Sequence, residues 1–246
     1  TETTYSIKGL QDNTEYQIRV TSVSDKSYVS EVVTVTTKER PPFPMEISTA
    51  DQWIQFVTGD IIILANNGAD DKVTLTADLD FTGKEYPADV VFKGVLDGNG
   101  KTIKNLKSAN PLFKEVTKVQ NLTIDASCAF TTTASAGFAA VTHTLPAGGE
   151  LNNVVNNASV TATWDNLEDP WVVGALAAYA WGKIEGCTNN GAVTLSATSM
   201  NTGAAGGFVG FTESEVNNTK NTGAINIHFG IAGAKMKIWE TNKWTK

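Results

Sequence analysis

LNNVVNNASVTA (residues 151–162), IEGCTNNGAVTL (184–195) and VNNTKNTGAINI (216–227) are three copies of one pattern. Their first residues lie 33 and 32 positions apart, and a shorter copy, VQNLTI (119–124), begins 32 positions before the first. A fixed period of this length is typical of stacked structural units, because one unit alone cannot bury its apolar face. The repeat therefore predicts the architecture of residues 46–246.

Apolar residues recur at fixed places within each copy. The tenth residue is Val160, Val193 or Ile225, and the twelfth is again apolar, with a polar residue between them. Alternation with a period of two indicates a β-strand. Ahead of the second and third copies, GALAA (174–178) and GGFVG (206–210) alternate small residues with larger apolar ones, which suits a strand on a crowded inner face. We expect about three short strands per repeat and no helix.

Asparagine and glycine occupy one level of every copy, at residues 156–158 (NNA), 189–191 (NNG) and 221–223 (NTG). Both residue types tolerate positive φ, so this level is predicted to be a turn. Asparagine side chains at matching levels also form hydrogen bonds from one layer to the next in stacked structures. We therefore expect an asparagine ladder along the stack.

Together these features predict an all-β protein in which the repeats stack as a parallel β-helix, or solenoid. The right-handed form is expected, because parallel crossover connections are nearly always right-handed. An antiparallel sandwich of short strands is the alternative, since regular turn spacing alone permits it. Matched levels of asparagine, glycine and apolar residues across three copies favour the β-helix.

One short helix is predicted at the start of this region. TADQ (49–52) has the form of a capping box, and Trp53 and Phe56 follow it on one helical face. The first coil of a solenoid leaves core side chains and strand edges uncovered. We expect an amphipathic helix over 50–58 to cap that N-terminal end.

Residues 1–38 form a separate predicted unit, with apolar and polar residues alternating around Tyr16 and again at 33–35, as in half-buried antiparallel strands. YSIKGLQDNTEYQIRVTSVS (5–24) and SEVVTVTT (30–37) resemble strands E, F and G of fibronectin type III domains. The resemblance implies a tyrosine corner, in which the Tyr16 hydroxyl bonds to the backbone a few residues upstream. A whole domain of this type needs about 100 residues. We therefore expect only a partial immunoglobulin-like β-sandwich, most simply a fragment of a longer chain.

A proline-rich linker, ERPPFPM (39–45), separates this unit from the predicted β-helix domain at 46–246. Its prolines end the last strand and stiffen the junction.

Composition excludes several classes of function. The net charge of −7, from 19 basic and 26 acidic side chains, disfavours binding to nucleic acid or anionic lipid. No run of about 18 apolar residues exists, so no membrane span is predicted. Cys128 and Cys187 are expected to be buried free thiols, with a disulfide between them as the alternative. Their spacing does not resemble a metal site. No cofactor or metal is predicted.

FKGVLDGNGKTIKNL (92–106) and VTLTADLDF (73–81) carry a second resemblance. They resemble the opening coils of pectin-lyase-like right-handed β-helices with GLUG-type repeats, whose DGNG and TI motifs match at 97–100 and 102–103. The resemblance covers residues 46 to about 234, and its motifs are structural. It implies a secreted or surface protein of Bacteroidetes, anchored to the outer membrane through a segment outside this sequence. Such modules also occur in non-catalytic parts of bacterial IgA-cleaving proteases.

The best candidate binding site is TWDNLEDPW (163–171), which interrupts the repeat. Aromatic faces beside acidic and amide groups suit sugar rings. The candidate residues, including two aromatic residues of the next coil, are Trp164, Asp165, Asn166, Glu168, Asp169, Trp171, Tyr179 and Trp181. The alternative is that these tryptophans fold back and cover the side of the solenoid.

No catalytic residue is predicted. Glycoside hydrolysis usually needs two carboxylates at a set separation, and matching levels of adjacent repeats do not carry such a pair. Asp78 and Asp80 belong to the structural motif, and His143 and His228 lie in different coils without a nearby nucleophile.

We therefore predict a non-catalytic secreted or cell-surface module for adhesion or glycan binding. Its expected partner is a polysaccharide or a host glycoprotein. A polysaccharide lyase or glycoside hydrolase on the same scaffold is one alternative. A structural stalk or phage fibre is another.

Overall fold

The structure is a computed structural model that forms two compact units, Thr1–Pro42 (unit 1) and Phe43–Lys246 (unit 2). It describes residues 7, 10–11, 13–24, 26–37, 44–58, 71–133, 137–164, 171–197, 202–229 and 235–239.

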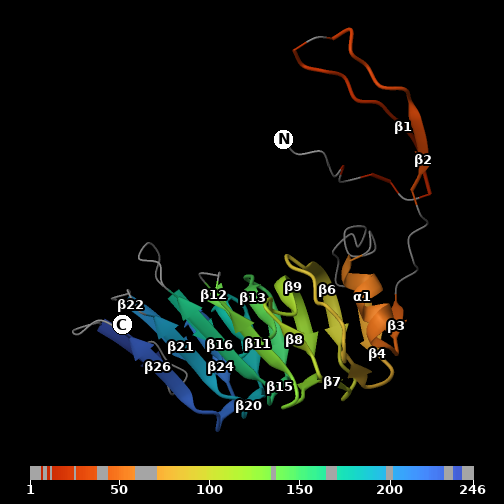
Figure 1. Cartoon of the computed structure of the whole chain (residues 1–246). Coiled ribbons are helices and arrows are strands. Elements are labelled where there is room, and N and C mark those ends of the chain that lie inside the picture. The colour runs from red at the N-terminus through yellow and green to blue at the C-terminus, as the bar shows by residue number, and fades with distance from the viewer. Residues whose placement is uncertain are drawn as a thin grey trace. The chain divides into compact units, whose positions relative to one another are not determined.

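Unit 2 is a parallel β-solenoid of about five turns, which confirms the predicted fold class (Figure 1). Its largest sheet consists of β3 (Met45–Ile47), β4 (Lys72–Leu75), β6 (Val91–Asp97), β9 (Phe113–Gln120), β13 (Thr142–Leu145), β14 (Glu150–Asn152), β18 (Ala177–Ala180), β19 (Lys183–Glu185), β23 (Val209–Thr212) and β24 (Val216–Asn217). A second sheet consists of β5 (Leu79–Asp80), β7 (Thr102–Lys104), β10 (Thr123–Ile124), β15 (Val155–Asn156), β20 (Thr188–Asn189) and β25 (Lys220–Asn221). The third sheet consists of β8 (Lys107–Ser108), β11 (Ala129–Thr132), β16 (Ser159–Trp164), β21 (Val193–Ala197) and β26 (Ile225–Phe229). The fourth consists of β12 (Gly137–Phe138), β17 (Trp171–Gly174), β22 (Thr202–Gly206) and β27 (Lys235–Trp239).

The register of the strands confirms the alignment of the sequence copies. Val119, Leu151, Ile184 and Val216 stand opposite one another in four successive coils. All four side chains are buried, as are the other apolar levels of the first two full copies. The core is therefore a set of apolar columns that run along the stack.

Each complete coil contains more strands than the predicted three. The coil from 171 to 197, for example, contains five, β17 to β21. Sharp corners divide the strands, and the corner between β17 and β18 requires glycine. A Cβ atom on Gly174 would overlap the carbonyl oxygen of Ala177, so the chain turns there more tightly than any other residue permits.

The positive-φ residues of the repeat lie elsewhere than predicted. The third position of each copy has positive φ, at Asn121 (53°), Asn153 (52°), Gly186 (62°) and Asn218 (50°). The level at 156–158, by contrast, contains no positive-φ residue. The chain does bend at this level, at Ala158, Gly191 and Gly223, so the predicted turn between two strands is present but has no positive φ. Asparagine serves two purposes in this repeat, a left-handed backbone at one level and side-chain hydrogen bonding at another.

The predicted asparagine ladder is present. Asn156 Nδ2 donates to Asn189 Oδ1 over 2.8 Å, and Asn189 Nδ2 donates to Asn221 Oδ1 over 2.8 Å. The side chains of Asn156 and Asn189 are fully buried. Burying an amide costs free energy unless it is hydrogen-bonded. In the ladder, each of these two buried amides donates a hydrogen bond to the asparagine of the next coil.

The predicted capping helix is present as α1 (Ala50–Thr58). Gln52 N donates to Thr49 Oγ1 over 3.2 Å, and Gln52 Oε1 accepts from Thr49 N over 3.2 Å, which is the reciprocal pair of a capping box. The helix lies beside β3 and β4 at the N-terminal end of the solenoid (Figure 1). Trp53 and Phe56 point inward from it and are fully buried. The helix thus covers the core of the first coils.

The DGNG motif forms the tight turn expected between β6 and β7, with positive φ at Asn99 (49°) and Gly100 (71°). Asp97 anchors this turn by accepting hydrogen bonds from Asn99 N (2.9 Å), Gln120 Nε2 (2.9 Å) and Asn121 Nδ2 (3.1 Å). Lys72 Nζ lies 2.9 Å from the same carboxylate. Burial alone raises the pKa of Asp97, but these donors outweigh it and lower the pKa to about 2.

Replacing Asp97 by asparagine is expected to change how stability depends on pH. A lowered folded-state pKa gives stability that is fully present above the ordinary value of 3.8 and is lost as pH falls through about 2. Because the side chain is only 13% exposed, we expect a contribution of about 2 kcal/mol. Urea unfolding of parent and variant should therefore differ at pH 7 and converge toward pH 2. Glu46→Gln, at an exposed carboxylate of β3, is the control; equal pH profiles for parent and Asp97→Asn would contradict the prediction.

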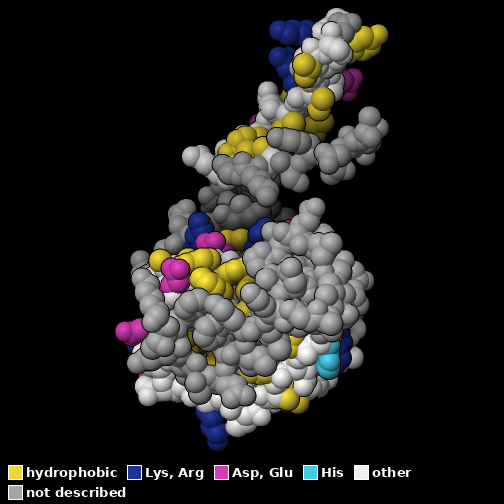
Figure 2. Space-filling view, turned by 90° about the vertical axis from the view of Figure 1, so that its left-hand side faces the viewer, with side chains coloured by type: hydrophobic (Ala, Val, Ile, Leu, Met, Phe, Trp, Pro, Cys, Tyr) yellow, Lys and Arg dark blue, Asp and Glu magenta, His cyan; other side chains and the backbone are white. Residues whose placement is uncertain are grey.

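The described part of unit 1 is one antiparallel hairpin of β1 (Glu15–Ile18) and β2 (Val33–Thr36). Gln11 N donates to the Tyr16 hydroxyl over 2.7 Å, which is the contact that the resemblance implied. Figure 2 shows hydrophobic side chains on the surface of this unit. Its exposed apolar residues include Val20, Val23, Tyr28, Val32 and Val33. A two-stranded sheet is marginally stable alone, and β1 and β2 form the one sheet in the described residues of unit 1.

A helix needs about 20 apolar residues to span a bilayer. With nine residues, α1 is too short, and the described part of the chain holds no other candidate.

Candidate functional site

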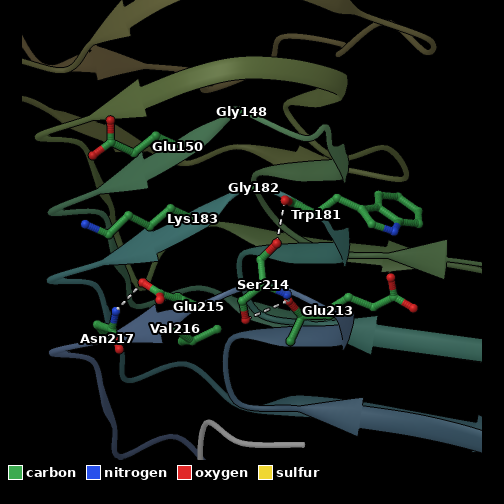
Figure 3. Close-up of a pocket in the computed structure, with 12 residues that line it drawn as sticks. Gly148, Glu150, Trp181, Gly182, Lys183, Glu213, Ser214, Glu215, Val216 and Asn217 are labelled. Carbon is green, nitrogen blue, oxygen red and sulfur yellow. Dashed lines mark hydrogen bonds between the residues drawn. The ribbon is translucent and has the colours of Figure 1, made fainter.

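A groove of about 860 Å³ lies where three successive coils turn the same corner, from β13 to β14, β18 to β19 and β23 to β24. We call it the corner groove (Figure 3). Its lining residues are Gly148, Gly149, Glu150, Trp181, Gly182, Lys183, Thr212, Glu213, Ser214, Glu215, Val216 and Asn217. Because each coil contributes one segment, the groove runs along the stack.

The floor of the groove is backbone. Gly149 N donates to Pro146 O over 2.9 Å and closes a turn in which Gly148 has a φ of +78°. Lys183 N donates to Gly149 O over 2.9 Å and ties this turn to the next coil. A Cβ atom on Gly182 would overlap the carbonyl oxygen of Gly149. Glycine is therefore needed for the coils to stack here, and the lack of side chains leaves the groove open.

One wall carries charged side chains in register. Lys118, Glu150 and Lys183 stand opposite one another in successive strands, and Glu215 follows at the same level of the next coil. Lys118 Nζ lies 2.8 Å from Glu150 Oε2. Glu150 also accepts from Asn152 Nδ2 over 3.0 Å. Lys118, with a smaller effect from Asn152, holds the pKa of Glu150 below its ordinary value.

The same wall continues toward the C-terminal coils. Lys183 Nζ lies 3.2 Å from Glu185 Oε2, and Glu215 Oε2 accepts from Asn217 Nδ2 over 3.1 Å. The hydrogen bond from Asn218, followed by that from Lys183, lowers the pKa of Glu185. The Glu185 carboxylate is therefore ionised at neutral pH and accepts hydrogen bonds.

The opposite wall is aromatic. Trp181 is 41% exposed, and its indole points away from Glu150 and Lys183, toward the side of Glu213 (Figure 3). The Tyr179 ring lies parallel to this indole, with centroids 6.0 Å apart and planes 9° apart. Trp181 N donates to Leu145 O over 2.9 Å, and Ser214 Oγ donates to Trp181 O. The backbone that carries the indole is therefore held from both neighbouring coils.

Tyr179 joins this indole to a larger aromatic cluster. Its ring lies 5.3 Å from His143 and 6.4 Å from Phe211, measured between centroids. Burial lowers the pKa of His143, with a smaller effect from the charge of Lys114. The imidazole is therefore neutral at pH 7 and packs as an aromatic ring.

The predicted site residues do not all lie together in the structure. It stacks Tyr179 against Trp181, and of these two Trp181 lines the corner groove. Trp164, by contrast, is 3% exposed and belongs to the core, as in the alternative in which the tryptophan folds back onto the solenoid. Its ring is therefore no platform for a sugar. Of Trp171 only the backbone is described, and Asp165, Asn166, Glu168 and Asp169 lie outside the described residues.

The burial of Trp164 follows from strand alternation. Val160, Ala162 and Trp164 share one parity in β16, and that parity points into the core. This signal was present in the sequence. Reading Trp164 as part of an insertion, instead of as the last residue of the strand, concealed it.

Neither cysteine offers a nucleophile. Cys128 and Cys187 are free and buried, as predicted, and burial raises the pKa of Cys187 to about 11. A protonated, inaccessible thiol is inert. Within the described ranges, no group of three or more His, Cys, Asp or Glu side chains is placed to hold a metal ion.

The fold and the groove define a parallel β-solenoid protein with a polar and aromatic surface groove. No family model matches the chain, and no curated protein matches it. A solved structure described as a "putative immunoglobulin A1 protease from Bacteroides ovatus" is similar with a TM-score of 0.49 and 15% sequence identity. The similarity covers 82% of this chain and 79% of that chain.

Proposed function

We propose that unit 2 is a non-catalytic carbohydrate-binding module and that the corner groove holds the sugar. The observation that carries the proposal is the Trp181 indole, half exposed beside Glu213 and across the floor from Lys183 and Asn217. Sugar rings pack their C–H faces on aromatic rings while their hydroxyls exchange hydrogen bonds with carboxylates, amides and ammonium groups. The groove volume of about 860 Å³ lies in the range typical of small-molecule sites.

Catalysis is less well supported than binding. The acid in a glycoside hydrolase is a carboxyl group with a raised pKa. In the groove wall, the shifted pKa values of Glu150 and its neighbour Glu185 both lie below the ordinary value. Such groups accept hydrogen bonds but do not donate protons at neutral pH. Release of unsaturated uronides from acidic polysaccharides, with and without calcium, would establish the alternative lyase function.

The proposal includes a setting for the module. The DGNG turn at 97–100 and the repeated coils support membership among GLUG-type β-helices, and the Tyr16 contact with Gln11 supports a fibronectin type III-like unit 1. On this resemblance, the proposed place of action is the surface of a Bacteroidetes cell, in adhesion or glycan capture. The competing proposal is a stalk or fibre that binds no ligand. A glycan screen distinguishes it from the binding module, because only the binding module should retain a glycan.

Replacing Trp181 by alanine is expected to weaken glycan binding about tenfold, because aromatic contacts of this kind contribute about 1.4 kcal/mol. The protein is first screened on a glycan array, and the affinity of parent and variant for the best glycan is then measured by calorimetry. Tyr28→Ala removes an aromatic side chain that is 73% exposed in unit 1 and serves as the matched control. Equal affinities of parent and Trp181→Ala, or an array without any bound glycan, would contradict the proposal.

A further inference from the structure

The charges around the corner groove distinguish between classes of glycan. The lining residues include three carboxylates, those of Glu150, Glu213 and Glu215, and one ammonium group, that of Lys183, so they carry two excess negative charges. The nearest partners outside the lining, Lys118 and Glu185, add one charge of each sign. The excess therefore remains after the ion pairs are included.

The two excess charges belong to Glu213 and Glu215. Glu150 is neutralised by Lys118 over 2.8 Å, and Lys183 is engaged by Glu185 over 3.2 Å. In the ranges that the structure describes, neither Glu213 nor Glu215 has an ion-pair partner, although Glu215 accepts a hydrogen bond from Asn217. Their side chains point to opposite sides of the floor (Figure 3). A ligand in the groove thus lies between two exposed carboxylates.

We propose that the corner groove selects uncharged oligosaccharides and rejects acidic ones. This inference rests on the proposed function and adds the class of ligand to it. Carboxylates accept hydrogen bonds from sugar hydroxyls, whereas they repel the carboxylates of uronic acids and the sulfates of sulfated glycans. Two like charges at contact distance reduce affinity about tenfold even at a water-exposed site. The net charge of −7 over the whole chain acts in the same direction.

The length of the ligand follows from the stacking. The three segments that line the groove come from three coils, and adjacent parallel strands lie about 4.8 Å apart. This distance is close to the length of one pyranose unit in an extended chain. The groove therefore has room for roughly two to three sugar units along the stack.

The experiment compares neutral tetraoses of glucose, mannose and galactose with the corresponding uronic acid tetramers. Dissociation constants are measured by calorimetry at low and at high ionic strength. We expect each neutral tetraose that binds to bind about tenfold more tightly than its uronate counterpart. Added salt should reduce this ratio, since salt screens exposed charges.

The test variant is the double substitution Glu213→Gln and Glu215→Gln, which keeps the shape of both side chains and removes both charges. The ratio of uronate to neutral dissociation constants is expected to fall about tenfold in this variant. Glu31→Gln with Glu46→Gln is the matched control, because both residues are exposed, lie outside the groove and change the net charge equally. The control should leave the ratio unchanged.

The outcomes separate this inference from the proposed function. Uronates that bind as tightly as neutral tetraoses, and that lose affinity in Trp181→Ala, would overturn the inference and leave carbohydrate binding in place. A ratio that is the same in the parent and the double glutamine variant would also overturn it. If no glycan of either series or of the array binds, carbohydrate binding itself fails.

Discussion

Trp53→Ala is expected to destabilise unit 2 by about 3–5 kcal/mol, as truncation of a buried aromatic residue usually does. The Trp53 ring is fully buried and lies 6.1 Å from Phe56 and 6.0 Å from Phe113, measured between centroids. Its Nε1 donates to the Tyr86 hydroxyl over 3.1 Å, and that hydroxyl donates to Leu112 O over 2.9 Å. The alanine variant thus loses a large apolar contact and a hydrogen bond at the same place.

The position of Trp53 makes this loss larger than in the middle of the stack. A central coil is covered on both sides by other coils, whereas the first coil relies on α1. Urea unfolding followed by circular dichroism measures the effect. Gln55→Ala, on the exposed side of the same helix, is the control and should change stability by less than about 0.5 kcal/mol. If Trp53→Ala costs no more than Gln55→Ala, α1 does not act as a cap.

Asn189→Ala is expected to cost about 2–4 kcal/mol. Asn189 donates to Asn221 Oδ1 (2.8 Å) and Gly191 O (2.9 Å), and it accepts from Asn156 Nδ2 (2.8 Å) and Gly191 N (3.2 Å). Truncation to alanine removes the hydrogen-bond partner of all four of these atoms, which lie in or next to the core. Each buried polar group that loses its partner costs about 1–3 kcal/mol, and relaxation recovers part of the sum.

The matched comparison is Asn221→Ala, at the end of the same ladder. Asn221 is only half buried, so water replaces its lost bonds. We expect a cost of about 1 kcal/mol there, within the usual range for one hydrogen bond. Unfolding of both variants in urea gives the two values. Equal costs at the two positions would show that burial does not set the strength of the ladder.

The repeat made most of the fold predictable. Copies of one pattern at a constant period stack with equivalent residues in register, because each apolar side chain must meet an apolar neighbour in the next coil. The sequence alone therefore aligns Leu151, Ile184 and Val216, which stand opposite one another in the structure. The capping helix was predictable for a local reason, since the Thr49–Gln52 box acts within one turn.

The site was predictable only in part. Exposed aromatic residues next to the repeat pointed to Tyr179 and Trp181, which do lie together. The sequence offered no comparable signal for Glu213, Glu215 or Lys183, because charged residues at coil corners occur in any solvated solenoid. Gly149 and Gly182 were a weak signal, being glycines at one level of two consecutive coils.

The sequence by itself determined the solenoid, its register, its asparagine ladder and its helical cap, because each depends on residues that repeat or that lie within a few positions of one another. Tertiary structure alone decided that the corner beside Trp181 opens to solvent. The corner opens because three turns of different length stack on one another, and at Gly149 and Gly182 the neighbouring backbone leaves no room for a Cβ atom. Such crowding is a contact between coils, and no single repeat contains it.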